Sequence, residues 1–185
     1  MQVVKKSIRW RGEESASLEH LVVDTVGTGM VLDAVVITGA SPQAHEAVRY
    51  RLYADDAGRT RRLQVQRVGE AQSLSLKSDG QGTWTSEDGT RLAQLEGALD
   101  VDLPVTPATN ALPIRRLSLC AGQSAEIEVA YINWPDLSVR RDPQRYTRLG
   151  PDRYLFESLD GSFHREITVD SEGFVIAYPG LFQRI

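Results

Sequence analysis

The sequence predicts an all-β protein, built as a single curved antiparallel sheet or open barrel with almost no helix. Most of the chain consists of short runs rich in β-branched and aromatic residues, many alternating between apolar and polar side chains, as is typical of strands. Asp-Gly pairs at 79–80, 88–89 and 160–161 lie between such runs, and this dipeptide is a strong hairpin signal. No segment carries a convincing amphipathic helix of three turns. We therefore expect about ten to twelve strands, and helix in less than about 15% of the residues.

The first 46 residues predict three strands and a loop. Val3–Trp10 places apolar side chains on one face if it is extended, and Glu19–Gly27 and Met30–Thr38 are β-branched runs separated by a glycine turn. Both of these runs hold neighbouring apolar residues, so we expect them to be covered on both faces. Ala40–Glu46, with its Ser-Pro pair, is expected to be a loop.

Alternation is clearest in the following strands. Ala47–Tyr53 puts Val48, Tyr50 and Leu52 on one face, with arginines on the other. Further strands are expected at Arg61–Val68, Ser73–Lys77, Thr83–Thr85, Tyr154–Glu157 and Phe163–Val169. We expect the Asp-Gly pairs between them to form type I′ turns, in which both central residues have positive φ.

The segment Leu95–Leu119 has no plain strand-turn-strand pattern. It holds three prolines, and each fixes its own φ, lacks a backbone donor and pushes the preceding residue toward extended geometry. The segment is therefore predicted to be an ordered, mostly extended connection. The best helix candidates are short, at Arg91–Glu96 and at Pro113–Leu117, where the proline suits a first helical position.

Length and composition are those of an ordinary globular protein. A chain of 185 residues suits one domain, taken here as 1–185, and the net charge of −4 argues against a nucleic-acid partner. Cys120 is the only cysteine and the three histidines are scattered, so neither a metal site nor a cofactor is expected. No window is apolar for long enough to span a membrane. The N-terminus shows no signal peptide, which predicts a cytoplasmic location.

Several motifs together resemble a known bacterial family. They are Trp84, the run LEGALDVDLPVTPATNALPIRRLSL at 95–119, Gln144–Thr147, Val169-Asp170 and the tail Tyr178–Phe182. The family was first catalogued as a domain of unknown function and later labelled putative glycolipid-binding. The resemblance implies a spiral β-roll, akin to the open barrels that carry lipoproteins in the periplasm, and a ligand of glycolipid type. The family's label rests on that structural likeness and brings no assigned catalytic residues.

Asp100 and Asp102 are the first candidate site. On an extended strand they share one face, with Cα atoms about 6–7 Å apart. Such a pair suits ligand binding or glycoside hydrolysis. Alternatively, it anchors an arginine, and for that case we expect an ion pair with Arg115, Arg116 or Arg145, because buried carboxylates need partners.

Other residues of these motifs are candidates for ligand contacts. Threonine and asparagine bind sugar hydroxyls but also satisfy turn backbone, arginine binds anionic head groups, and aromatic rings stack on sugars but more often fill cores. The full set of candidate ligand-binding residues is Asp100, Asp102, Thr106, Thr109, Asn110, Arg115, Arg145, Tyr146 and Trp84.

The functional prediction is a binding protein for an amphipathic small molecule such as a glycolipid, held in the curved sheet without turnover. The alternative is a hydrolase of a sugar or lipid substrate that uses Asp100 and Asp102. A protein-interaction module is a third class. The interior of the barrel distinguishes these classes. A sizeable apolar cavity would favour a binding protein, and a polar cleft with a raised carboxylate pKa would favour an enzyme. A filled interior with neither feature would leave only the protein-interaction module.

Overall fold

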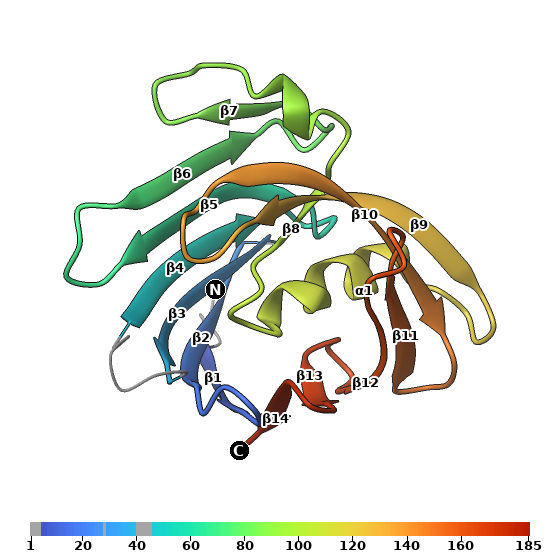
Figure 1. The fold of residues 1–185 in the computed structure, drawn as a ribbon. Helices are drawn as coiled ribbons and strands as arrows, with labels where there is room; N and C mark the ends of the chain where they lie inside the picture. The colour runs from blue at the N-terminus through green and yellow to red at the C-terminus, as the bar shows by residue number, and fades with distance from the viewer. Residues whose placement is uncertain (1–4, 28, 40–45) are drawn as a thin grey trace.

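The fold is one curved sheet of fourteen strands, described in a computed structural model for residues 5–27, 29–39 and 46–185. The strand order is β7-β6-β5-β4-β3-β2-β1-β14-β13-β12-β11-β10-β9-β8, and the sheet curls without closing, with β7 and β8 at its edges (Figure 1). The strands are β1 Lys5–Gly12, β2 Leu18–Val26, β3 Gly29–Thr38, β4 Glu46–Ala54, β5 Thr60–Arg67, β6 Ser73–Ser78, β7 Trp84–Ser86, β8 Asp100–Asp102, β9 Ser124–Ile132, β10 Val139–Arg148, β11 Arg153–Ser158, β12 His164–Val169, β13 Val175–Tyr178 and β14 Phe182–Arg184.

This architecture confirms the predicted all-β class and curved sheet. The strand number exceeds ten to twelve because β8, β13 and β14 have only three or four residues each, too few to show alternation. The expected loop at 40–45 lies outside the described residues. No helix of the described part is long and apolar enough to cross a membrane.

The two ends of the chain meet in the middle of the sheet. β1 pairs with β14 in an antiparallel register that sets Trp10 opposite Arg184. The buried Trp10 indole also donates a hydrogen bond to the carbonyl of Val175 at 2.8 Å. The pairing joins two antiparallel meanders, β1–β7 and β9–β14, into one continuous surface (Figure 1).

One strand breaks the antiparallel pattern. β8 follows the hairpin of β6 and β7, crosses to the far edge of the sheet and pairs in parallel with β9, with Asp102 opposite Tyr131. Two short 3₁₀ turns lie on either side of β8, η1 at Ala93–Leu95 and η2 at Ala108–Asn110. The first falls within the helix candidate predicted at Arg91–Glu96.

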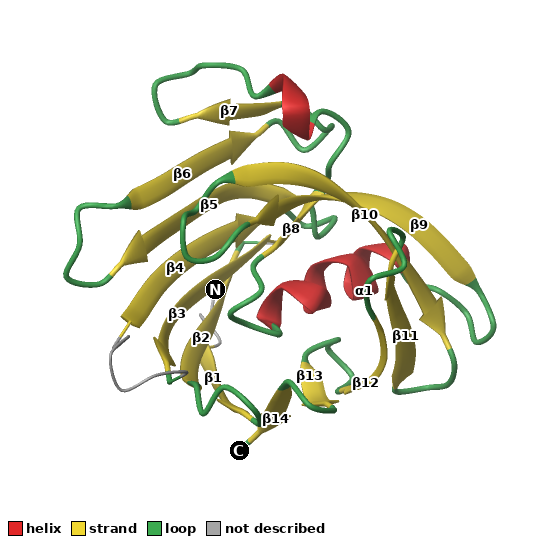
Figure 2. Cartoon of the chain, in the orientation of Figure 1, coloured by secondary structure: helices red, strands yellow, loops and turns green. Residues whose placement is uncertain are grey.

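A short helix occupies the inside of the roll. It confirms the helix candidate at Pro113–Leu117, but with the 3₁₀ turn before it the prediction of a mostly extended connection is wrong. η2 runs directly into helix α1, Ala111–Leu117, which lies inside the curve of the sheet (Figure 2). Pro113 is tolerated because it lies in the first turn of α1, where backbone N–H groups lack helical acceptors. The apolar side of this segment is buried and fills the interior of the roll, with Leu103, Ala108, Ala111, Leu112 and Ile114 in the core.

Inward-facing residues alternate along the strands as predicted. On β4, Val48, Tyr50 and Leu52 are buried while Arg49 and Arg51 are exposed. The expectation that β2 and β3 are covered on both faces is wrong, because Val35 and Ile37 on the outer face of β3 are 42% and 55% exposed. Val31, farther along the same face, is buried, so the described residues cover only part of that outer face.

The Asp-Gly turns are also different from the predicted type I′. Only the glycines have positive φ, at 76° for Gly80, 88° for Gly89 and 77° for Gly161. Each aspartate instead caps its own turn, as when the carboxylate of Asp160 accepts a hydrogen bond from the backbone N–H of Ser162 at 2.8 Å. The side-chain bond stabilises the turn without a positive φ at the aspartate.

Candidate functional site

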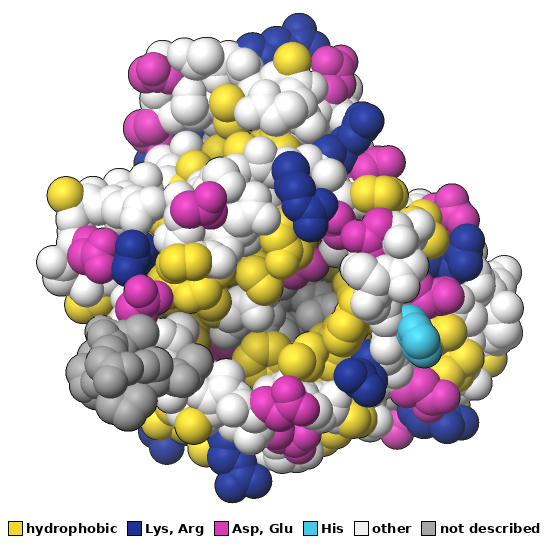
Figure 3. Space-filling model, in the orientation of Figure 1, with side chains coloured by type: hydrophobic (Ala, Val, Ile, Leu, Met, Phe, Trp, Pro, Cys, Tyr) yellow, Lys and Arg dark blue, Asp and Glu magenta, His cyan; other side chains and the backbone are white. Residues whose placement is uncertain are grey.

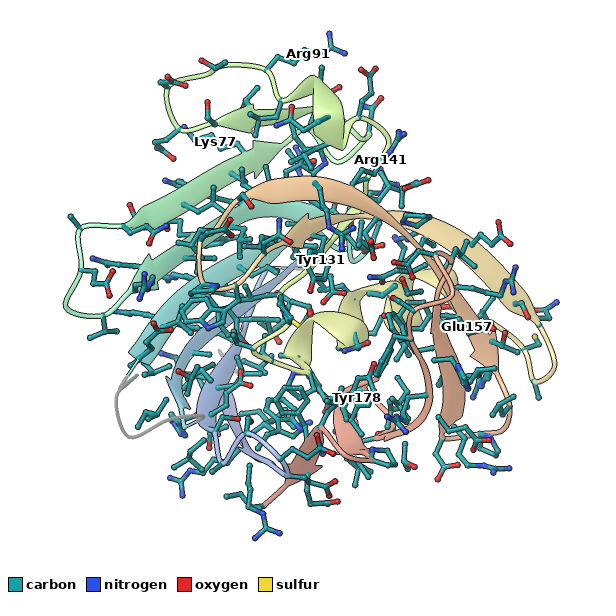
Figure 4. All side chains as sticks on the ribbon, in the orientation of Figure 1. Lys77, Arg91, Tyr131, Arg141, Glu157 and Tyr178 are labelled. Carbon is teal, nitrogen blue, oxygen red and sulfur yellow. The ribbon has the colours of Figure 1, made fainter. Side chains whose placement is uncertain are left out.

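A cleft of about 350 Å³ opens where the helical segment leaves part of the roll uncovered. Figure 3 shows a hollow near the centre of this face, with hydrophobic side chains along its rim and charged side chains close by. Tyr131 on β9 lies above the helical segment in Figure 4 and Tyr178 on β13 lies below it, and both line the cleft. The lining residues are Asp102, Pro104, Thr106, Asn110, Tyr131, Arg140, Asp142, Gln144, Phe156, Ser158, Asp160, Ser162, Phe163, Tyr178, Leu181 and Phe182.

One wall of the cleft is a carboxylate pair bridged by an amide. The Nε2 group of Gln144 donates to Oδ2 of Asp102 at 2.7 Å and to Oδ2 of Asp142 at 3.2 Å. Arg140 forms an ion pair with Asp142, and its guanidinium lies 4.3 Å from the centre of the Tyr131 ring. Arg140, Asp142 and Gln144 alternate along β10, so the pleat turns all three toward the inside of the roll.

The two carboxylates have different surroundings. Burial raises the pKa of Asp102 to about 6, with a further rise from the charge of Asp142, while the hydrogen bond from Gln144 and the charge of Arg140 act in the opposite direction. Asp142 has a direct cationic partner in Arg140, whereas Asp102 forms no ion pair with any described residue. The charge of Asp102 therefore changes at about pH 6.

The opposite wall is aromatic. Phe156 lies 5.9 Å from Phe163 and 6.4 Å from Tyr178, and Tyr178 lies 6.4 Å from Phe182, measured between ring centres. These rings come from β11, the β11–β12 turn, β13 and β14, so they are separated in sequence and brought together by the curl of the sheet. The tilted and edge-to-face arrangements are favourable for aromatic pairs and make a stable apolar surface.

The floor of the cleft is held by a buried carboxyl that sequence reasoning missed. Tyr50 and Thr106 each donate a hydrogen bond to Oε1 of Glu19, at 2.6 Å and 2.9 Å. Burial raises the pKa of Glu19 to about 7, although these two hydrogen bonds lower it. Thr106 in turn accepts from the backbone N–H of Ala108 at 3.0 Å, which ties the start of η2 to the sheet. The available signal was that Glu19 lies in register with Leu21 and Val23 on the inward face of β2.

Five of the predicted site residues lie at the cleft or directly behind it. Asp102, Thr106 and Asn110 line the cleft. Tyr146 supports it from within the core, where its hydroxyl donates to Oδ1 of Asn110 at 2.9 Å. Thr109 is buried in the same helical turn.

The remaining candidates lie elsewhere. Asp100 is fully buried against Arg116, with Oδ2 2.5 Å from the guanidinium, which confirms the predicted aspartate–arginine anchor. Arg115 is exposed on α1 and donates to the carbonyl of Glu172. Arg145 lies on the outer surface and pairs with Glu126 and Glu157. Trp84 is in the core, where its indole donates to the carbonyl of Ala98.

These placements change which carboxylates act together. Asp100 and Asp102 do share one side of β8, but Asp100 is paired with Arg116, and the carboxylate that shares the Gln144 amide with Asp102 is Asp142. Asp142 was missed because it is forty residues away from Asp102 and only the alternation of β10 places it inside. In the described part of the chain, no cluster of three or more His, Cys, Asp or Glu residues is arranged to hold a metal ion.

Comparisons with known proteins agree with this fold. The model of a family described as putative glycolipid-binding matches residues 7–184. The crystal structure of a DUF1089 family protein from Pseudomonas aeruginosa is similar, with 37% sequence identity, a TM-score of 0.79 and 95% of each chain covered. A search of the curated proteins finds no match. Because the family model covers nearly the whole chain, this protein belongs to the putative glycolipid-binding family.

Proposed function

We propose that this protein binds a sugar-bearing amphipathic molecule, a glycolipid, by its head group and without chemical change. The observation that carries the proposal is the two-sided cleft, which sets hydrogen-bonding groups on Asp102, Gln144 and Asn110 across from an aromatic wall. A sugar ring presents hydroxyls around its edge and apolar C–H groups on its faces, so it needs both kinds of surface. Ligand sites in general combine apolar walls with a few placed polar groups.

The volume of the cleft favours a head group over a whole lipid. Pockets for small molecules span about 300–1,000 Å³, and the 350 Å³ here suits one sugar ring better than a ring with its acyl chain. The inside of the roll is filled by α1, so a chain entering the curved sheet would have to displace Leu112 and Ile114 from the core. In this proposal the acyl chain stays outside, beside the apolar side chains of Phe163, Leu181 and Phe182.

Calorimetry with short-chain alkyl glycosides tests the proposal. Binding should saturate with one ligand per chain, and mass spectrometry should recover the glycoside unchanged. Phe163→Ala removes a half-buried ring of the cleft wall and should weaken the affinity about two- to tenfold, in line with the energy of aromatic contacts. Leu149→Ala, a partly exposed position away from the cleft, is the matched control. If no glycoside binds, or if Phe163→Ala binds as tightly as the parent, the proposal is wrong.

A hydrolase is the second candidate, and the Asp102–Asp142 pair favours it. Because both carboxylates accept from one nitrogen, their nearest oxygens are no more than about 6 Å apart, close to the separation used by retaining glycosidases. Asp102, protonated below about pH 6, would protonate the leaving oxygen. The carboxylate of Asp142 would attack the anomeric carbon to give a glycosyl ester, which water then hydrolyses. Free sugar released from the glycoside by the parent, but not by Asp102→Asn or Asp142→Asn, would replace the binding proposal with this one.

A further inference from the structure

The charge of the cleft identifies the kind of head group it accepts. Three carboxylates line it, those of Asp102, Asp142 and Asp160, against one cation among the described lining residues, Arg140. Arg140 is already paired with Asp142. Hydrogen bonds from Ser162 and Ser158 hold the pKa of Asp160 below its usual value, so this third carboxylate stays ionised at the mouth of the cleft. The lining therefore carries net negative charge.

The arginines that could bind an anionic head group either lie on the outer face of the sheet or already form ion pairs with carboxylates of the protein. Arg49 forms a two-oxygen contact with Asp33 on the outer face, and Arg145 is shared between two glutamates there. Arg116 is held by the buried carboxylate of Asp100. A phosphate or carboxylate entering the cleft would meet Asp102 and Asp160 without a free cation among the lining residues, which is unfavourable for an anion.

One acceptor on the polar wall is left open. Oδ2 of Asp102 takes the hydrogen bond from Gln144, while no donor among the described residues reaches Oδ1, which is not enclosed by protein. A ligand N–H group at this position would complete the coordination of the carboxylate with a charge-assisted hydrogen bond. Phe156, Tyr178 and Phe182, which line the same cleft, add an aromatic surface of the kind that favours cations.

We propose that the cleft selects a head group bearing a protonated amine, such as an amino sugar, with the ammonium bound to Asp102 and the apolar ring face against the aromatic wall. This inference rests on the proposed sugar-binding function and adds a charge preference to it. Neutral sugars bind through the same hydroxyl contacts but more weakly. Sugars that carry a carboxylate or a phosphate are rejected.

The amine should bind in a pH-dependent way that a neutral sugar does not share. Asp102 is about 10% ionised at pH 5 and about 90% ionised at pH 7 if its pKa is about 6, so affinity for the amine should rise about tenfold across this range. The titratable and charged groups that face Asp102 from the packed elements are Asp142, Arg140 and Tyr146 on β10, Tyr131 on β9 and Tyr178 on β13. Burial raises the pKa of all three tyrosines, so they stay neutral throughout.

Calorimetric titration of the parent protein with four sugars at pH 5 and pH 7 is the test. The probes are glucosamine, glucose, glucuronate and glucose 6-phosphate. We expect glucosamine to bind at least tenfold more tightly than glucose at pH 7, and the two acidic sugars to bind more weakly than glucose. Glucose binding with no amine preference would overturn this inference and leave the proposed function standing. No binding of any of the four sugars, nor of the alkyl glycosides, would overturn both.

Substitutions test whether Asp102 is the source of the amine preference and of its pH dependence. Asp102→Asn keeps the size of the side chain and an acceptor but removes its charge, so the tenfold advantage of glucosamine and its pH dependence should disappear. Ser73→Ala, on β6 and outside the cleft, is the control for both. If Asp102→Asn does not fold, the pH profile of the parent decides the question. A glucosamine affinity that is flat between pH 5 and pH 7 would contradict the assignment of the ammonium to Asp102.

Discussion

Replacing Glu19 with glutamine should change the pH dependence of stability. Glu19 is 2% exposed, and burial raises its pKa from 4.5 to about 7 in the folded protein. Between these two values the folded state binds the proton more tightly than the unfolded state does. The stabilisation from this group is therefore complete below about pH 4.5 and is lost as the pH rises to about 7.

The size of the effect follows from the shift. A difference of about 2.5 pKa units corresponds to roughly 3 kcal/mol in the free energy of unfolding. Glutamine keeps an oxygen for the hydrogen bonds from Tyr50 and Thr106 but cannot ionise. Its amide nitrogen takes the place of Oε2, which is buried without a hydrogen-bond partner in the parent. The variant should thus match the parent at pH 5 within about 1 kcal/mol, and exceed it by roughly 3 kcal/mol at pH 8.

Urea unfolding at pH 5 and pH 8 measures this difference through the midpoint and the slope. The raised pKa values of Asp100 and Asp102 make both proteins less stable at high pH, but their contributions cancel between parent and variant. Glu166→Gln, at an exposed position of β12, is the matched control and should change the free energy of unfolding by less than about 0.5 kcal/mol at either pH. Equal losses of stability in the parent and in Glu19→Gln between pH 5 and pH 8 would refute the reasoning.

Three further substitutions test the helical segment by thermal and urea unfolding. Arg116→Ala leaves the buried carboxylate of Asp100 without its cation and should cost about 3–5 kcal/mol. Leu112→Ala opens a cavity between α1 and the sheet and should cost about 2–5 kcal/mol. Tyr146→Phe removes the hydroxyl that donates to Asn110 behind the cleft and should cost about 1 kcal/mol.

Neighbours on the same helix supply the controls. Arg115→Ala, beside Arg116 but exposed, should lie within about 0.5 kcal/mol of the parent. Leu117→Ala removes a partly buried leucine and should cost less than Leu112→Ala. If Arg116→Ala unfolds like Arg115→Ala, the Asp100 ion pair does not anchor the segment. Equal costs at the two leucines would contradict the packing of α1 inside the roll.

The sequence by itself determined the fold class and most of the strands, because the signals involved are local. Side chains alternate between the two faces of a strand, so the spacing of Val48, Tyr50 and Leu52 indicates the buried face of β4 even when the neighbouring strands are unknown. The sequence also determined that an aspartate of β8 would need an arginine, since a buried carboxylate has few other partners. That partner, Arg116, lies only sixteen residues from Asp100.

The cleft was decided by the tertiary structure alone. Asp102 and Asp142 share an amide only because β8 crosses to the far edge of the sheet and pairs in parallel with β9, and no local pattern indicates that crossing. Local proline rules predicted a mostly extended connection with a short helix at Pro113–Leu117. In the structure the helix begins two residues earlier, at Ala111, and burial of Leu112 and Ile114 inside the curve stabilises it. The charge of the cleft follows in large part from the same cause, because the curl of the sheet turns Asp102 of β8 and Asp142 of β10 inward, while Arg49 and Arg145 lie on the outer face. The exposed turn between β11 and β12 adds Asp160.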